Sequence, residues 1–168
     1  MKTCLPKSER GITLIELMIV ITVLTILMFM GTSLTRSWID RSQVNNTINI
    51  LRNSVQQAKV MALRNPENQA LNQAAIHLCL DETNNSLHIV RPKADTSNEC
   101  SLSSSNNIVL QSTDLASNVF IQHNNSQFKC LAFNAAGVVV STGGQCATQN
   151  QLRFKVGKNN ESADITLM

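Results

Sequence analysis

Gly11 stands at a position suited to peptide-bond cleavage. It separates a short polar leader, which carries three lysine and arginine residues, from an apolar run that ends near Met30. A secretory signal peptide has its cleavage site after the apolar region, so that this region is discarded. Here the small residue comes first. Cleavage between Gly11 and Ile12 would therefore remove the charged leader and keep the hydrophobic segment.

Glu16 is an acidic residue inside that apolar run. From Ile12 to Met30 the other polar residues are three threonines, and the length is close to the ~20 residues that span hydrocarbon. A carboxylate at membrane depth costs on the order of 2.5–3.5 kcal/mol and normally marks a functional contact. Its candidate partner is the α-amino group that cleavage would create on Ile12, in the same chain or in a neighbouring one. A hydrated carboxylate near the membrane surface is the plainer alternative.

The charges on either side of the apolar run indicate its orientation. Three basic residues precede it, and Arg36 and Arg41 follow it. Because cytoplasmic flanks carry the excess of Lys and Arg, this modest bias favours a cytoplasmic N-terminus. The rest of the chain is then expected on the opposite side of the membrane.

Cysteine usage fits an exported domain. Cys4 belongs to the leader, and four cysteines remain after cleavage, which allow three pairings as two disulfides. We favour the pairing of sequence neighbours, Cys79–Cys100 and Cys130–Cys146. A zinc site is the weaker interpretation, because no cysteines have CxxC spacing and the three histidines do not cluster with them. No metal or other cofactor is expected.

The sequence gives little support for an enzymatic activity. The three histidines are distant from any recognisable Ser or Cys nucleophile motif, and the chain has no Walker A loop and no dinucleotide-binding glycine pattern. We therefore expect a non-enzymatic protein.

A weak nucleic-acid contact is the remaining binding hypothesis. Arg153 and Lys155 alternate with apolar residues, so they share one face of an expected strand, and Lys158 follows in the next expected turn. A few cations give little affinity for phosphates at physiological salt. The formal net charge of +3 includes +2 from the leader, so the mature chain is close to +1. A solvated strand face is the favoured interpretation.

Hydrophobic periodicity predicts an α+β architecture. A helix is expected from about 13 to 64, stopped by Pro66, with one apolar face formed by Val44, Ile48, Leu51, Val55, Ala58 and Ala62. A period of two then predicts strands over 75–80, 87–91, 107–112, 118–122, 127–134, 138–141, 151–156 and 164–167. Expected turns or loops cover 81–86, 94–106, 123–126, 143–149 and 157–162, and Gly137 is expected at positive φ in a hairpin turn.

The segment Arg10-Gly11-Ile12-Thr13-Leu14-Ile15-Glu16-Leu17 resembles the processing signature of type IV prepilins and type II secretion pseudopilins, with Ile12 in place of the usual Phe. A long helix followed by a mostly antiparallel β domain with a late glycine hairpin looks like the GspH/FimT group, especially the FimU/FimT-type minor pilins. The resemblance implies a leader over 1–11, a helix over 12–64 with its polymerisation and transmembrane part over 12–30, and a periplasmic β-rich domain over 65–168.

The same resemblance implies partners and roles. A prepilin peptidase would cleave after Gly11 and the new Ile12 terminus would be N-methylated, while Glu16 would guide docking to the amino terminus of a neighbouring pilin. The expected function is a minor pilin in the priming tip complex of a type IV pilus, assembled with major and minor pilins. The alternatives are a minor pseudopilin of a type II secretion system and a DNA- or surface-binding tip subunit. DNA-binding relatives carry an arginine-rich C-terminal motif, which this chain lacks.

Overall fold

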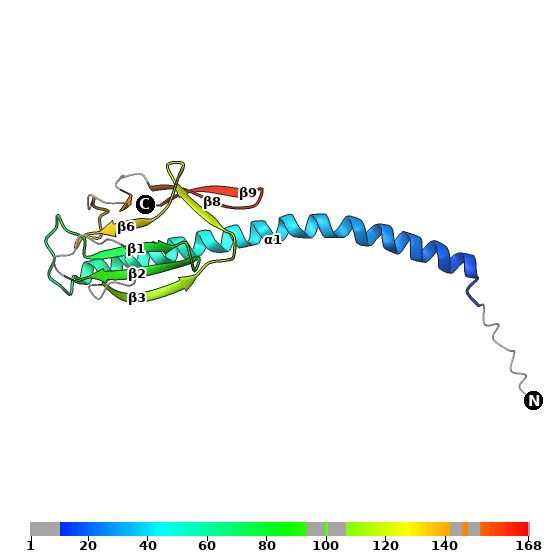
Figure 1. Ribbon diagram of the computed structural model, residues 1–168, viewed down its shortest axis with the longest axis horizontal. Helices are drawn as coiled ribbons and strands as arrows, with labels where there is room; N and C mark the ends of the chain where they lie inside the picture. Colours follow the sequence, from blue (N-terminus) through cyan, green and yellow to red (C-terminus); the bar gives the residue numbers. More distant parts are fainter. Residues whose placement is uncertain (1–10, 94–99, 101–106, 142–145, 148–151, 168) are drawn as a thin grey trace, which may run out of the picture. The chain divides into compact units, whose positions relative to one another are not determined.

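The protein contains one long helix and nine strands in the part of the chain that the structure describes. The computed structural model describes residues 11–93, 100, 107–141, 146–147 and 152–167, without the side chains of residues 30–34. It divides into two compact units, Met1–Trp38 and Ile39–Met168. Figure 1 shows helix α1 and the strands that follow it, which confirms the α+β class expected from the sequence.

Helix α1 spans Leu14–Arg64, as the periodicity predicted. Its first turn is capped by Thr13, whose Oγ1 accepts a hydrogen bond from the backbone N–H of Glu16 at 3.3 Å. Its end is set by Asn65, which has a positive φ of 38° and exchanges two side-chain hydrogen bonds with the backbone of Gln69. Pro66 then follows, which cannot donate a backbone hydrogen bond to a continued helix.

The first sheet has five strands in the order β3-β2-β1-β6-β7. Its central strand β1 (Ile76–Asp81) pairs antiparallel with β2 (Ser86–Pro92) and with β6 (Cys130–Phe133). Strand β3 (Asn107–Asp114) pairs with β2 and forms one edge, and the short β7 (Cys146–Ala147) runs parallel to β6. A register shift between Ile89 and Val90 leaves Leu110 as an extra residue in β3.

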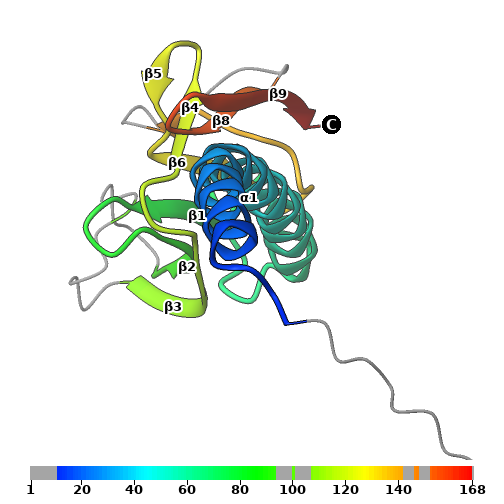
Figure 2. The same ribbon diagram turned by 90° about the vertical axis from the view of Figure 1, so that its right-hand side faces the viewer.

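The second sheet has four antiparallel strands in the order β5-β4-β8-β9. It consists of β4 (Phe120–His123), β5 (Ser126–Gln127), β8 (Leu152–Lys158) and β9 (Glu161–Leu167). Figure 2 shows the strands of the two sheets on different sides of helix α1. The helix therefore serves both sheets as a common support.

One hydrophobic core joins the helix to both sheets. The predicted apolar face of the helix is buried along its length, from Val44 at 2% exposure to Ala62 at 0%. The same cluster contains Leu78 and Leu131 from the first sheet and Phe154 from the second. Ala58 and Ala62 have small side chains, so strands can approach the helix closely there. The periodicity prediction for this face is confirmed.

The predicted number of strands was close to the observed number, whereas the bounds of several strands were wrong. The expected strand over 127–134 is interrupted and forms β5 and β6, while 138–141 contributes an isolated bridge between Phe133 and Val139. Strand β7 lies inside the segment expected to be a turn over 143–149, because pairing with β6 extends it. Strands β8 and β9 extend into the expected turn over 157–162. The expected loop over 94–106 lies outside the described residues except for Cys100.

Asparagine supplies most of the left-handed backbone in the turns. Seven asparagines have positive φ, and four of them, Asn85, Asn124, Asn125 and Asn159, fall in segments predicted as turns. Asparagine tolerates this conformation better than most residues do. Gly137 also has a positive φ, of 71°, in the hairpin turn where it was expected.

Two disulfides lie side by side on the first sheet. Cys79 is bonded to Cys100 and Cys130 to Cys146, which is the favoured pairing of sequence neighbours. Cys79 is opposite Cys130 across β1 and β6, and Cys130 is opposite Cys146 across β6 and β7. The sulfur atoms of Cys100, Cys130 and Cys146 therefore lie within 4.8 Å of one another. Zinc binds thiolates, whereas these sulfurs are used in disulfides.

We predict that the mature chain has no free thiol and that each bridge contributes about 2–4 kcal/mol to the free energy of unfolding. Thiol titration of the unfolded, unreduced mature protein should detect no sulfhydryl. Two or more free sulfhydryls would contradict the two-bridge structure. The paired replacement of Cys79 and Cys100 by alanine should lower the free energy of unfolding by this amount, measured by chemical denaturation.

Candidate functional site

The cleavage candidate lies in an open segment before the first helix. Gly11 and Ile12 precede α1 and are exposed, and a Cβ added at Gly11 would find nothing within 4 Å. Nothing in the described part of the chain blocks access to this peptide bond. A Cβ at position 11 would therefore not clash with the described part of the fold.

The first turns of α1 present apolar side chains all round. The exposed fractions range from 49% for Leu24 to 83% for Phe29, and the set is Leu14, Ile15, Leu17, Met18, Ile19, Val20, Ile21, Val23, Leu24, Ile26, Leu27, Met28 and Phe29. The hydroxyls of Thr22 and Thr25 donate to backbone carbonyls one turn earlier, so little polar surface interrupts this segment. An apolar surface of this extent requires cover from lipid or from other helices.

Among the described residues, no helix combines the length and the apolar character needed to cross a membrane. The transmembrane part expected over residues 12–30 stays a prediction.

Glu16 lies in the first turn of this apolar helix and is exposed. An acidic residue there interacts favourably with the positive end of the helix dipole. Thr13 and Glu16 also have the spacing of a capping box, and the Thr13 half of it is formed. Ile12 precedes Glu16 by four residues, so cleavage after Gly11 would create a positive amine near this carboxylate in the sequence. The site would then combine a new cation and an anion within an apolar surface.

The three cations proposed for nucleic-acid contact have different surroundings. Arg153 and Lys155 are exposed on β8, where their opposite residues on β9 are Thr166 and Asp164. Asp164 thus places a negative charge beside Lys155. Lys158 is 9% exposed, and its ammonium donates to Gln43 Oε1 at 2.6 Å and to the carbonyl of Ser117 at 2.7 Å. Lys158 is therefore a buried hydrogen-bond donor within the domain and is not placed to contact a phosphate.

Sequence reasoning missed this link between the second sheet and the helix. Next to Lys158, the side-chain amide of Asn159 donates to Asp40 Oδ2 at 2.8 Å. The two contacts hold the β8–β9 turn against the residues Asp40 and Gln43 of α1. No local signal predicts them, because the partners are 115 and 119 residues apart in sequence.

The described contacts of His88 do not form a catalytic relay. Nε2 of His88 lies 2.8 Å from Ser86 Oγ and 4.0 Å from Asp81 Oδ2, so one ring nitrogen makes both contacts and no relay through the ring results. The hydrogen bond from the Asn84 amide keeps the pKa of Asp81 below its usual range. Burial lowers the pKa of His123, whose ring packs against Phe154.

The comparisons with known proteins concern the N-terminal segment. Residues 6–32 match the model of the prokaryotic N-terminal methylation motif. No curated protein and no solved structure matches the chain. The matched range contains Gly11, Ile12, Glu16 and the exposed apolar turns of α1. This type IV prepilin-like signal indicates a pilin-like or pseudopilin protein, processed by a prepilin peptidase and assembled with other pilins.

We predict that Lys158→Ala destabilises the domain by about 1–3 kcal/mol, because it leaves two polar acceptors, on Gln43 and Ser117, without their donor. The matched control is Lys155→Ala, which removes an exposed lysine from the same strand and should change stability little. Chemical denaturation of the mature protein measures both. Equal effects of the two substitutions would contradict the internal role of Lys158.

Proposed function

We propose that this chain is a minor pilin of the GspH/FimT type, a structural subunit in the tip complex that initiates assembly of a type IV pilus. The observation that carries the proposal is the methylation motif over residues 6–32, which includes the first turns of α1, where the exposed side chains from Leu14 to Phe29 are almost all apolar. A helix of this kind is suited to burial among identical or similar helices. The disulfide-bonded β domain is suited to an oxidising compartment.

The subunit would be held in the inner membrane before assembly. Its leader would face the cytoplasm and its β domain the periplasm, consistent with the distribution of basic residues. Prepilin peptidase would then cleave after Gly11 and leave an N-methylated Ile12. Residues 12–30 would pass from lipid into the filament, exchanging one apolar environment for another.

Glu16 would direct the docking of one subunit onto the next. A carboxylate in apolar surroundings is stabilised most by a fixed positive charge, and the new amine of Ile12 supplies one. If the carboxylate of one subunit pairs with the amine of its neighbour, residue 16 of one chain lies level with residue 12 of the next. This pairing would set the axial offset of neighbouring subunits.

Two other assignments share part of this support. A minor pseudopilin of a type II secretion system would have the same N-terminal segment and the same kind of domain. A DNA-binding tip subunit has weaker support, because Lys158 is committed internally and Lys155 lies beside Asp164. Gene neighbourhood separates the first two assignments, and filter binding of the mature protein to DNA tests the third.

Processing is predicted to occur between Gly11 and Ile12. In cells with an active prepilin peptidase, mass spectrometry should find a mature chain that begins with methylated Ile12. Gly11→Val should leave the uncleaved precursor in the membrane and out of filaments, whereas the leader variant Thr3→Val should be processed normally. An intact leader on the wild-type chain would defeat the proposal.

The carboxylate of Glu16 is predicted to matter for assembly and not for folding. Glu16→Ala removes a charge from an apolar helix, so membrane insertion should be unharmed while attraction to a neighbour's amine is lost. The variant should be processed and form both disulfides, yet appear in sheared filaments at a much lower level than wild type. Glu82→Ala, at an exposed turn of the domain, is the control. Normal recovery of Glu16→Ala in filaments would exclude the docking role.

A further inference from the structure

Exposed apolar side chains gather at one end of the β-containing unit. Among the described residues from 39 onward, seven large apolar residues are exposed, namely Ile39, Val60, Leu63, Leu71, Val109, Leu110 and Val138. Four of these surround the end of α1 and the turn at Asn134. Exposed apolar residues scattered singly are normal on a protein surface, whereas a contiguous group marks a binding site.

Contacts with the Asn134 turn bring three of the four residues together. The side-chain amide of Asn134 donates to the carbonyl of Leu71 at 2.8 Å, and its Oδ1 accepts from the backbone N–H of Val138 at 3.0 Å. Gly137 of the same turn lies against Leu63, whose side chain would be 3.7 Å from a Cβ added there. Val60 precedes Leu63 by one turn of α1. We name Val60, Leu63, Leu71 and Val138 the distal patch.

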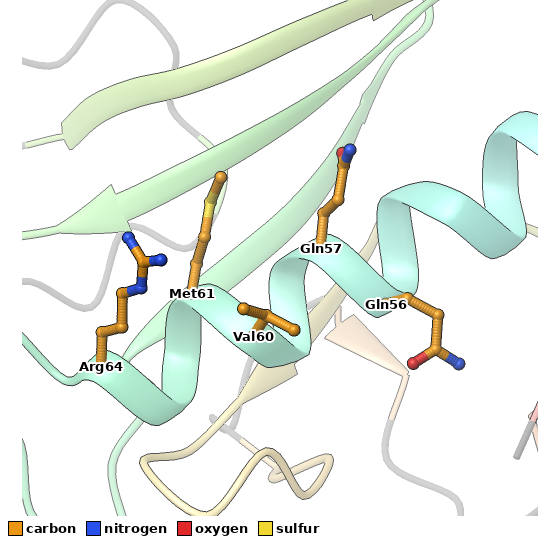
Figure 3. A pocket seen from close by; sticks show the side chains of 5 residues that line it. All are labelled: Gln56, Gln57, Val60, Met61 and Arg64. Carbon is orange, nitrogen blue, oxygen red and sulfur yellow. The ribbon is translucent and has the colours of Figure 1, made fainter.

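A cavity adjoins the distal patch at Val60. It has a volume of about 250 Å³ and is lined by Gln56, Gln57, Val60, Met61 and Arg64. Figure 3 shows Gln57, Met61 and Arg64 projecting from one side of α1 and Gln56 from the other, with Val60 between the turns that carry them. This volume is below the usual range for drug-sized ligands and suits an inserted apolar side chain.

The end of helix α1 that carries part of the patch has basic residues and no acidic ones. Between residues 41 and 64 helix α1 contains three arginines and one lysine and no acidic residue. Arg52 and Arg64 are exposed, and Arg64 lines the cavity. The first acid after the helix in the sequence, Glu67, lies 3.5 Å from Arg91 and is paired with it. A surface that combines apolar anchors with exposed arginine favours a partner with an apolar side chain flanked by carboxylates.

We propose that the distal patch and its cavity bind the globular domain of a different pilin subunit, through an apolar side chain inserted beside Val60 and a carboxylate that meets Arg64. The proposal rests on the function proposed above, since filament helices would hold the two domains at high effective concentration. Leu63 lies about 36 Å along the helix from Ile39, where this unit begins, and it is 59% exposed. A second copy of this chain fits poorly in a symmetric contact, because the same arginines would face one another.

Site-specific photocrosslinking of the full chain in filament-producing cells tests this contact. A photoreactive phenylalanine analogue replaces Leu63 or, as the control, the exposed Thr166 on β9. We expect an adduct from position 63 and not from position 166, with a second chain that mass spectrometry identifies as another protein carrying the N-terminal methylation motif. No adduct, an adduct with lipid or with a protein lacking that motif, or an adduct with a second copy would overturn the proposal.

Two charge variants sharpen the test. Leu63→Asp and Arg64→Glu should each reduce the adduct formed by an analogue at Val138 by about tenfold or more, because one loses the apolar anchor and the other repels the partner's carboxylate. Thr166→Asp adds the same charge elsewhere and should leave the adduct unchanged. Non-reducing electrophoresis confirms that both disulfides form in every variant. Undiminished adduct in both charge variants would overturn the proposal.

The failure of this contact is distinguishable from the failure of the proposed function. If the wild-type chain keeps its leader or is absent from filaments, the function proposed above falls and the distal contact falls with it. If wild type is processed and enters filaments, while position 63 gives no pilin adduct, only the distal contact is excluded.

Discussion

The buried face of helix α1 between Val44 and Ala62 is the constraint on which the rest of the domain depends. Two sheets that share no strand both pack against it in one hydrophobic cluster, and a second, smaller cluster surrounds the disulfides of the first sheet. Each sheet includes a very short strand, since β5 and β7 have two residues each. A sheet of this kind gains stability by covering an apolar surface, because an isolated small sheet is marginally stable in water. Loss of the helix face would leave both sheets without that surface.

Disulfides and side-chain hydrogen bonds add to the apolar packing that holds the two sheets in the domain. The two disulfides hold β7 and Cys100 to the central strands of the first sheet. In the second sheet, hydrogen bonds from Lys158 and Asn159 attach the β8–β9 turn to the helix. Their acceptors are Gln43 and Asp40, respectively. A buried lysine requires acceptors, and Gln43 and Ser117 supply them at hydrogen-bonding distance. Each sheet is thus attached both by apolar packing and by specific contacts.

The same helix carries two kinds of surface for two purposes. In its first turns the exposed side chains are apolar on all sides, and the charged group among them is Glu16. In its last turns one face is buried in the core, and the other combines arginine with Val60 and Leu63. In the proposed assembly, the first surface would pack against other helices, and the second would make a more selective contact between domains. Selectivity would then come from charge and shape at the distal patch, where apolar area alone would accept many partners.

Local patterns in the sequence determined the features that depend on neighbouring residues. The spacing of Val44 to Ala62 predicted the buried face of the helix, Pro66 predicted its end, and Gly137 predicted a turn with positive φ, because periodicity and turn chemistry act over a few residues. The signature from Arg10 to Leu17 indicated the prepilin-like segment in the same way. The tertiary structure alone decided the division into two sheets, the pairing that creates β7, and the use of Lys158 as an internal donor. These features depend on partners distant in sequence, so no local pattern encodes them.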